Sequence, residues 1–140
     1  MIILDTNVIS ELVRREPSPV VLRNLRRLPS NDLYTTAIAE AEIRFGLAIL
    51  PRGRKHTALR DQLDLILKQE FAGRILPFDS PAAEAYAALV AGRRLAGQPI
   101  SVFDAQIAAI ALIHGATLAT RNVRDFRGLR LPLLDPWAEL

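Results

Sequence analysis

The sequence has no cysteine, only two histidines and no long apolar run. Disulfide bonds and thiolate zinc sites are therefore excluded, and His56 and His114 are too few for a histidine-rich metal site. The longest unbroken apolar stretch, residues 107–113, is far shorter than the roughly 20 residues that span a bilayer. The N-terminus lacks a basic region, so its apolar residues favour a buried strand over a signal peptide. We expect a soluble, cytoplasmic protein in which oxygen atoms hold any metal.

The composition indicates one folded unit. With 140 residues, half of them hydrophobic, the chain is long enough for a single domain over residues 1–140 with an ample core. The formal net charge is +3, and arginine greatly outnumbers lysine, which favours phosphate recognition without identifying a partner.

Short apolar strands alternate with helical patterns along the chain. Strands are predicted at residues 2–4, 33–35, 74–77, 117–119 and 129–133. Helices are predicted at about 6–13, stopped by the proline-containing segment 16–19, and at 19–28. Further helices are predicted from the Thr36 cap to 49 and at 57–71, 80–97 and 102–114. Parallel neighbouring strands need long, usually helical, connections. The pattern predicts an α/β fold, a single three-layer domain with a central parallel sheet covered by helices.

Three acidic residues occupy apolar surroundings. Asp104 lies in the helix at 102–113, which is apolar on every side, and Asp5 ends the apolar opening of the chain. Glu42 shares a helix face with the apolar residues Ile38, Phe45 and Ile49. A carboxylate in such a setting needs a partner.

These acids are expected to meet at one edge of the sheet. Asp5 follows a strand, and Asp104 and Glu42 stand in the first two turns of their helices, where ligands bind in open α/β sheets. Two carboxylates about 4 Å apart repel by roughly 4 kcal/mol at an effective dielectric near 20. A divalent cation reverses that sign, and carboxylate oxygens suit Mg²⁺ or Mn²⁺. The acids therefore predict a metal site suited to phosphodiester hydrolysis.

Each acid also has a purely structural interpretation. Asp104 could complete a capping box with Ser101 and complement the helix dipole. Asp5 could cap the helix that follows it. Glu42 could form a structural salt bridge, for instance with Arg74.

Several blocks carry a resemblance to a known family. They are residues 2–8, Glu42 with Gly46, Asp104 with residues 107–109, and residues 120–126; residues 71–79 and 135–137 add to them. Together they resemble the PIN-domain family and, more narrowly, the VapC-type toxins of toxin–antitoxin pairs, including the FitB-like subgroup. The match spans nearly the whole chain.

The resemblance implies an Mg²⁺- or Mn²⁺-dependent endoribonuclease. Asp5, Glu42 and Asp104 match the family's three central acids, as catalytic residues and metal ligands. Asn122 stands where many relatives have a fourth acid, and its neutral carbonyl would bind a second metal more weakly. Asp125 could compensate, or it could be a surface acid paired with a neighbouring arginine.

Other residues are candidates for supporting roles. Thr6, Asn7 and Thr120 could orient the acids, although threonines there are equally ordinary helix caps. The phosphate-binding candidates are Arg14, Arg15, Arg121, Arg124 and the basic loop at 52–55. His56, which follows these residues, is also expected in a basic loop. Scattered aromatic residues offer no visible base-stacking platform.

The resemblance also implies partners and a rival function. A homodimer bound by a small DNA-binding antitoxin is expected, with RNA as the substrate. FitB-like proteins join such an antitoxin in a repressor complex, so the chain could be a co-repressor with little or no catalysis that contacts DNA only through its partner. A DNase is a further alternative, because the same acids can cut either backbone. A dehalogenase-like phosphatase is disfavoured, since position 7 is Asn rather than a second Asp.

Overall fold

The computed structural model describes residues 1–139 and contains a parallel five-stranded sheet in the order β3-β2-β1-β4-β5. The strands are β1 (Ile2–Leu4), β2 (Leu33–Thr36), β3 (Ile75–Leu76), β4 (Thr117–Ala119) and β5 (Leu133–Leu134). In the central strand, Ile3 pairs with Tyr34 on one side and with Leu118 on the other. The predicted α/β class is confirmed.

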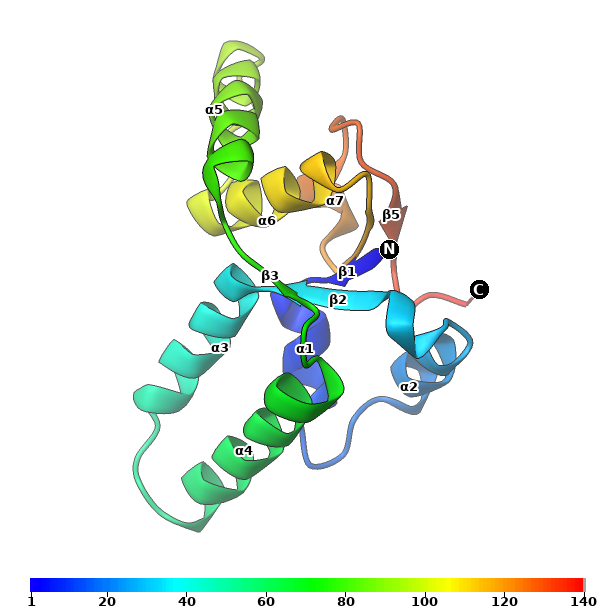
Figure 1. Ribbon diagram of the computed structural model, residues 1–140, viewed down its shortest axis with the longest axis vertical. Helices are drawn as coiled ribbons and strands as arrows, with labels where there is room; N and C mark the ends of the chain where they lie inside the picture. The colour runs from blue at the N-terminus through cyan, green and yellow to red at the C-terminus, as the bar shows by residue number, and fades with distance from the viewer. Residues whose placement is uncertain (140) are drawn as a thin grey trace.

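Helices cover both faces of this sheet (Figure 1). On one face lie α5 (Ser80–Leu95), α6 (Val102–Ile113) and the short α7 (Val123–Phe126). The other face is covered by α1 (Thr6–Leu12), α2 (Pro19–Arg26), α3 (Ala37–Ala48) and α4 (Arg54–Asp64), which continues as the π-helix η2 (Leu65–Glu70). A 3₁₀ turn, η1 (Ser30–Asp32), precedes β2. The arrangement has three layers, as predicted.

Each face of the sheet has its own apolar core. Above the sheet in Figure 1, Ile3 and Leu118 pack with the buried residues of α6 and with Phe126. Below it, Leu4 packs with Val8 of α1 and with buried residues of α2, α4 and η2. Each fully buried side chain of this size contributes roughly 1.5–3 kcal/mol. Successive β1 residues thus anchor opposite layers, and the end of β1 is fixed from both sides.

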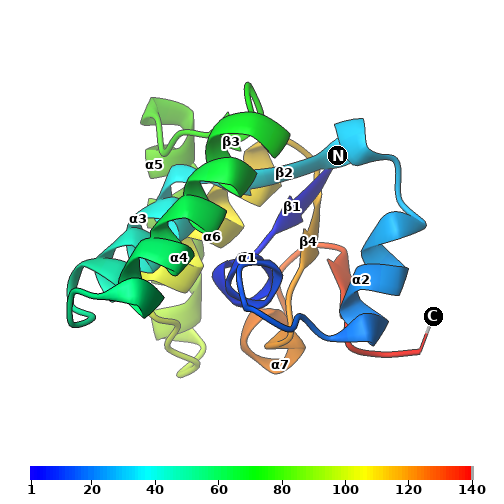
Figure 2. The same cartoon turned by 90° about the horizontal axis from the view of Figure 1, so that it is seen from below.

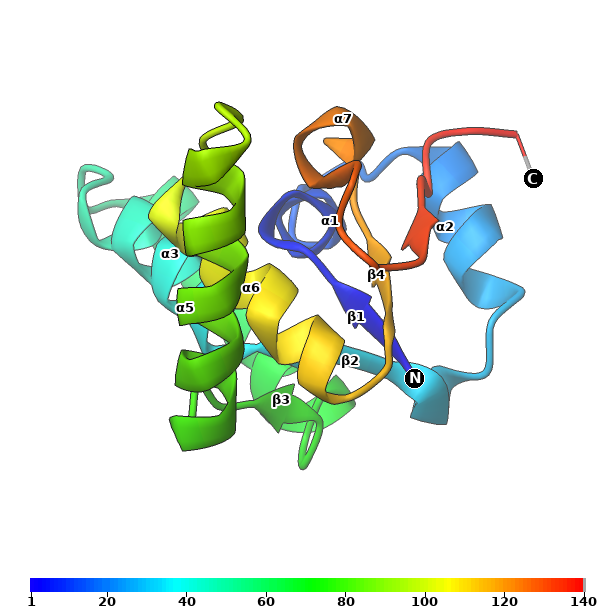
Figure 3. The ribbon, with the colours of Figure 1, turned by 90° about the horizontal axis from the view of Figure 1, so that it is seen from above.

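The carboxyl ends of the central strands open into helix starts at one edge of the sheet. In Figures 2 and 3, α1 lies at the end of β1 and α7 lies beyond β4 at the same edge. Figure 1 places α1 and α7 on opposite faces of the sheet. The starts of these helices therefore lie at the edge of the sheet where parallel sheets bind ligands.

Several local predictions were wrong. The last strand is β5 at Leu133–Leu134 rather than residues 129–133, and the helix predicted at 57–71 begins at Arg54, so His56 is helical and not in a loop. Phe45 and Ile49 are 67% and 68% exposed, so the apolar face expected around Glu42 is not a core face. Within residues 1–139, no helix has the length and hydrophobicity to span a membrane.

Candidate active site

Asp5 is the most completely fixed acid of the site. It follows β1 directly, is buried, and caps α1 by accepting a hydrogen bond from the backbone N–H of Thr6 at 2.8 Å through Oδ1. Its Oδ2 accepts a second bond, of 2.7 Å, from the Thr120 hydroxyl. The capping role considered from the sequence is therefore real, and the second carboxylate oxygen ties the helix start to the residue after β4.

Burial raises the pKa of Asp5 from 3.8 to about 6. The bonds from Thr120 and Thr6 lower this pKa, while the charges of Asp104 and Glu42 raise it further. The three acids thus act on one another electrostatically. A cation near Asp5 would relieve both the desolvation and the repulsion.

Thr120 joins the ends of two neighbouring strands. It is fully buried, and besides donating to Asp5 its Oγ1 accepts bonds from Asn7 Nδ2 at 3.3 Å and from the Asn122 backbone N–H at 3.0 Å. Asn7 Oδ1 accepts from the backbone N–H of Arg121 at 3.2 Å. This network ties the start of α1 to the segment after β4.

Glu42 is brought to the same crevice by α3. Thr36 caps this helix, because its hydroxyl oxygen accepts from the backbone N–H of Ala39 at 3.0 Å. Glu42 Oε1 accepts a 2.8 Å bond from the Thr6 hydroxyl. Neighbouring hydroxyls therefore orient both Asp5 and Glu42, as hydroxyls around metal-binding carboxylates commonly do.

The salt-bridge interpretation of Glu42 is wrong. Among residues 1–139 Glu42 forms no ion pair. The neighbouring Arg44 instead pairs with Glu40 at 2.8 Å and with Asp64 at 3.2 Å, on a different side of α3. Glu42 is therefore oriented in the crevice by the hydrogen bond from the Thr6 hydroxyl.

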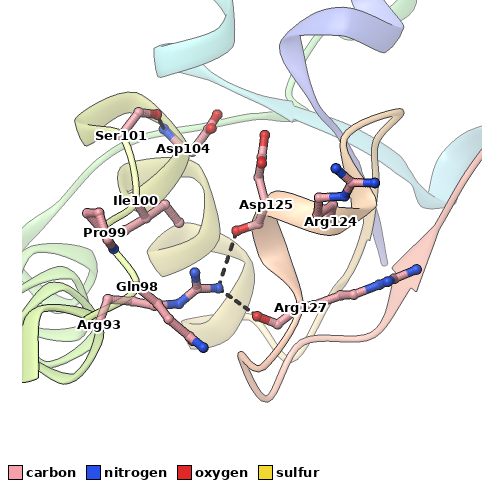
Figure 4. A pocket seen from close by; sticks show the side chains of 9 residues that line it. All are labelled: Arg93, Gln98, Pro99, Ile100, Ser101, Asp104, Arg124, Asp125 and Arg127. Atoms are coloured by element: carbon pink, nitrogen blue, oxygen red, sulfur yellow. Dashed lines mark hydrogen bonds between the residues drawn. The ribbon is translucent and has the colours of Figure 1, made fainter. Parts of the chain in front are cut away.

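Asp104 stands in the first turn of α6 and is half-buried. Ser101 caps the helix by accepting from the backbone N–H of Asp104 at 3.2 Å. Burial raises the pKa of Asp104; the Ser101 hydroxyl lowers it, and the charge of Asp125 raises it further. In Figure 4 the carboxylates of Asp104 and Asp125 both point toward the top of the view.

The three acids and Asn122 line one open cleft of about 490 Å³. Its other lining residues are Thr6, Asn7, Ser10, Glu11, Arg14, Arg121 and Trp137. Asp125 is absent from this cleft and lines a neighbouring cavity of about 530 Å³, to which Asp104 also contributes (Figure 4). The structure thus brings together all four predicted catalytic residues, whereas Asp125, whose backbone N–H donates to the Asn122 carbonyl at 3.0 Å, lines the neighbouring cavity.

The phosphate-binding candidates are spread over three surfaces. Arg14 and Arg121 line the acidic cleft, whereas Arg124 lines the cavity beside it. Arg15 lies in a groove of about 1030 Å³ between the end of α1 and the start of α4, together with Arg54 and Lys55. Arg14 and Arg121 thus stand beside the three acids, and Arg14 already forms an ion pair with Glu11 at 3.1 Å.

The donor set fits a hard divalent cation by its chemistry. Asp5, Glu42 and Asp104 offer carboxylate oxygens and Asn122 a carbonyl oxygen, the ligand types that Mg²⁺ and Mn²⁺ prefer. As their side chains stand, no three Asp, Glu, His or Cys residues within 1–139 are spaced to enclose an ion. The acids surround the cleft without converging on a single point.

Sequence reasoning missed two features of this region. Trp137 lines the acidic cleft, and the Arg121 guanidinium lies 5.0 Å from the centre of its ring. In the neighbouring cavity, Arg93 of α5 donates to the backbone carbonyls of Asp125 and Arg127 at 3.2 and 2.7 Å (Figure 4). These contacts join segments far apart in the chain, so no local pattern could reveal them.

The relatives of this chain are consistent with the geometry. The family model "PIN domain" matches residues 2–130. Over 137 residues the chain is 42% identical to the VapC ribonuclease Y4jK of Sinorhizobium fredii, covering 98% of each protein. It is also 42% identical over 137 residues to the toxin FitB of Neisseria gonorrhoeae, covering 98% of this chain and 99% of FitB.

A solved structure has nearly the same fold. A chain in the structure of FitAB bound to an IR36 DNA fragment superposes with a TM-score of 0.92 at 40% identity, covering 100% of this chain and 98% of that one. With the family model matching nearly the whole sequence and these relatives matching end to end, the chain belongs to the PIN-domain family.

Proposed function

We propose that this protein is a metal-dependent endoribonuclease that acts as the toxin of a toxin–antitoxin pair. The observation that carries the proposal is the acidic cleft, in which hydroxyl groups orient two carboxylates beside a third. The relatives named as a VapC ribonuclease and as toxin FitB support nuclease activity.

In this proposal Asp5, Glu42 and Asp104 hold Mg²⁺ or Mn²⁺, and Asn122 offers a weaker neutral ligand. When bound, such an ion would orient and acidify a water molecule for in-line attack on phosphorus and offset the charge on the leaving oxygen.

The chain's own groups prepare this chemistry. The hydroxyls of Thr120 and Thr6 fix one oxygen each of Asp5 and Glu42, so these carboxylates need little reorganisation on binding. Arg14 and Arg121 at the same cleft would offset the repulsion between the acids and an approaching RNA phosphate.

The second candidate is the co-repressor function. It is favoured by the solved FitAB complex on DNA, whose toxin-like chain has this fold. In this proposal a small DNA-binding antitoxin supplies the DNA contacts, and the chain acts as a homodimer. Large apolar side chains that are exposed around the α5–α6 connection suit a protein interface; they are Leu95 (90% exposed), Val102 and Phe103.

Cleavage of a structured RNA panel by the antitoxin-free protein tests the first proposal. The assay would compare Mg²⁺, Mn²⁺ and EDTA, with Asp5→Asn beside a matched control, Asp61→Asn, which changes an exposed acid of α4. We expect metal-dependent cleavage by the wild type and by Asp61→Asn, and none by Asp5→Asn. Folded proteins that are all inert, or all equally active, would refute the catalytic assignment and favour the co-repressor function.

A further inference from the structure

Trp137 is the only tryptophan of the chain, and it forms part of the acidic cleft. It is also the only aromatic residue among the residues that line this cleft, within the described part of the chain. The other lining residues carry carboxylates, hydroxyls, amides or guanidinium groups. A flat apolar surface thus stands beside the groups proposed to cut a phosphodiester bond.

The segment that carries Trp137 is held in place at several points. Asn24 of α2, which is buried, donates through Nδ2 to the carbonyls of Pro136 and Ala138, each at 2.8 Å. The backbone N–H of Trp137 donates to Asp135 Oδ1 at 2.9 Å. The indole packs partly against the core beneath α1 and α2 and stays partly accessible. The ring is therefore a fixed surface with an open part.

Arg121 extends this surface. Its guanidinium lies 5.0 Å from the centre of the indole ring, within the range of a cation–π contact. Its backbone is fixed to Asn7, which belongs to the network around Asp5. The Trp137–Arg121 pair is thus connected to Asp5 through the side chain of Asn7.

We propose that the Trp137–Arg121 pair is a nucleobase subsite, on which a base of single-stranded RNA next to the scissile phosphate stacks. This inference rests on the proposed ribonuclease function. Proteins recognise unpaired RNA bases by stacking them on aromatic rings and on arginine planes, and both surfaces occur here together. A cleft of about 490 Å³ lies in the range that accommodates small ligands.

Stacking also answers an electrostatic problem of this site. Four carboxylates, Glu11 included, line the cleft and repel an incoming phosphate. Of the two arginines that the described residues place there, Arg14 is paired with Glu11 at 3.1 Å, so part of its charge is already offset. Stacking on an uncharged ring adds affinity without adding charge, by about tenfold or more for one base. The pair would thus hold the strand beside the acids.

The single tryptophan allows a direct test in the unmodified protein. In EDTA, which prevents metal-dependent cleavage, Trp137 emission would be followed during titration with a short oligoadenylate and with an abasic strand of the same length. We expect the oligoadenylate to change the emission and to bind about tenfold more tightly than the abasic strand. Equal effects of the two strands, or RNA binding with unchanged emission, would overturn the subsite.

Substitutions test the same point without relying on fluorescence of the protein. Binding of labelled oligoadenylate should weaken about tenfold in Trp137→Leu and should recover largely in Trp137→Phe, which keeps an aromatic ring. Phe45→Leu is the matched control, because Phe45 is an exposed aromatic outside the cleft. Equal binding by folded Trp137→Leu and wild-type protein would refute the proposal, whereas a merely structural role predicts no difference between oligoadenylate and abasic strands.

The two proposals fail in distinguishable ways. Metal-dependent RNA cleavage with no base-dependent emission change would remove the subsite and leave the nuclease function. A base-dependent emission change without cleavage would support the subsite and count against catalysis by the acids.

Discussion

The acidic cleft has two sides that are built differently. On the Asp5 side, made of Asp5, Thr6, Glu42 and Thr120, hydroxyl groups hold both carboxylates at 2.7–2.8 Å. On the Asp104 side, made of Asp104 and Asn122 with Asp125 in the neighbouring cavity, the groups are half-buried or exposed. Among residues 1–139, no ion pair fixes the carboxylates of Asp104 and Asp125.

The Asp5 side is thus preorganised, whereas the Asp104 side can adapt to what binds there. On the Asp5 side, the folded protein already buries and orients the carboxylate of Asp5, and this burial raises its pKa. On the Asp104 side, exposed groups can move toward a cation or a substrate phosphate at little cost. We therefore expect changes on the Asp5 side to have the larger effects on metal binding and on stability.

The largest expected effect is on stability without metal. Because burial raises the pKa of Asp5 from 3.8 to about 6, the folded state binds the proton more tightly than the unfolded chain between these values. The stabilisation that protonated Asp5 gives the folded state is complete below about pH 4 and is lost as the pH rises through about 6. The free energy of unfolding should fall by about 3 kcal/mol over this range. In EDTA, Asp5→Asn should therefore be more stable than the wild type at pH 7 and equally stable near pH 4, by urea unfolding.

Saturating Mg²⁺ should remove this advantage, because a bound ion stabilises only the protein that retains the carboxylate. An Asp5→Asn variant that is less stable than the wild type by the same amount at every pH would show that Asp5 is a structural cap and no more.

The second comparison removes the hydroxyls one at a time. Thr120→Val and Thr6→Val keep the side-chain shape, and each should weaken Mn²⁺ binding roughly 10- to 100-fold. Thr120→Val should have the larger effect, because its hydroxyl connects Asp5 with Asn7 and with the Asn122 backbone. Thr117→Val, at the other end of β4, is the control. Unchanged Mn²⁺ affinity in folded Thr120→Val, measured by calorimetry, would contradict this account.

A negative charge added on the Asp104 side should strengthen Mn²⁺ binding, by less than the loss of a hydroxyl on the Asp5 side weakens it. Asn122→Asp places a fourth carboxylate in the cleft and should tighten Mn²⁺ binding by roughly tenfold or less, since the number of charged ligands tunes affinity. Without metal, added repulsion should lower the melting temperature. Weaker Mn²⁺ binding by Asn122→Asp would mean that position 122 faces no cation.

Removing a helix cap should also cost more stability on the Asp5 side than on the Asp104 side, although the difference between the two caps should be small. Thr36→Ala, at the start of the helix carrying Glu42, should cost about 1–2 kcal/mol because Thr36 is fully buried. Ser101→Ala, at the start of the helix carrying Asp104, should cost only about 0.5 kcal/mol because Ser101 is exposed. Urea unfolding at fixed pH measures both, and equal or reversed costs would contradict the comparison.

The fold was largely predictable from local sequence patterns. The apolar runs before Asp5 and Thr120, the Thr36 cap and the Ser80-Pro81 start lie where the structure has the corresponding strands and helices. The last strand was misplaced because residues 129–134 form one leucine-rich run, and only pairing of Leu133 with Leu118 selects its register. The short α7 has too few residues to show a helical period.

The candidate site was predictable only in its residue types. Acids in apolar segments marked Asp5 and Asp104, but Glu42 was chosen on a face whose Phe45 and Ile49 turned out to be exposed. The pairing of hydroxyls with carboxylates depends on contacts between distant segments; Thr6 and Glu42, for example, are 36 residues apart in the sequence. The position of Trp137 at the cleft also depends on tertiary contacts. Such contacts follow from tertiary packing and leave no local pattern.

Calorimetric titration of metal-free protein with Mn²⁺ would show which side of the cleft holds the metal. We expect the wild type to bind Mn²⁺, Asp5→Asn to weaken binding at least about 100-fold, and Asp125→Asn to weaken it by less than about tenfold. Unchanged binding by folded Asp5→Asn, or a greater loss in Asp125→Asn than in Asp5→Asn, would contradict the assignment of the cleft's metal to the preorganised Asp5 side.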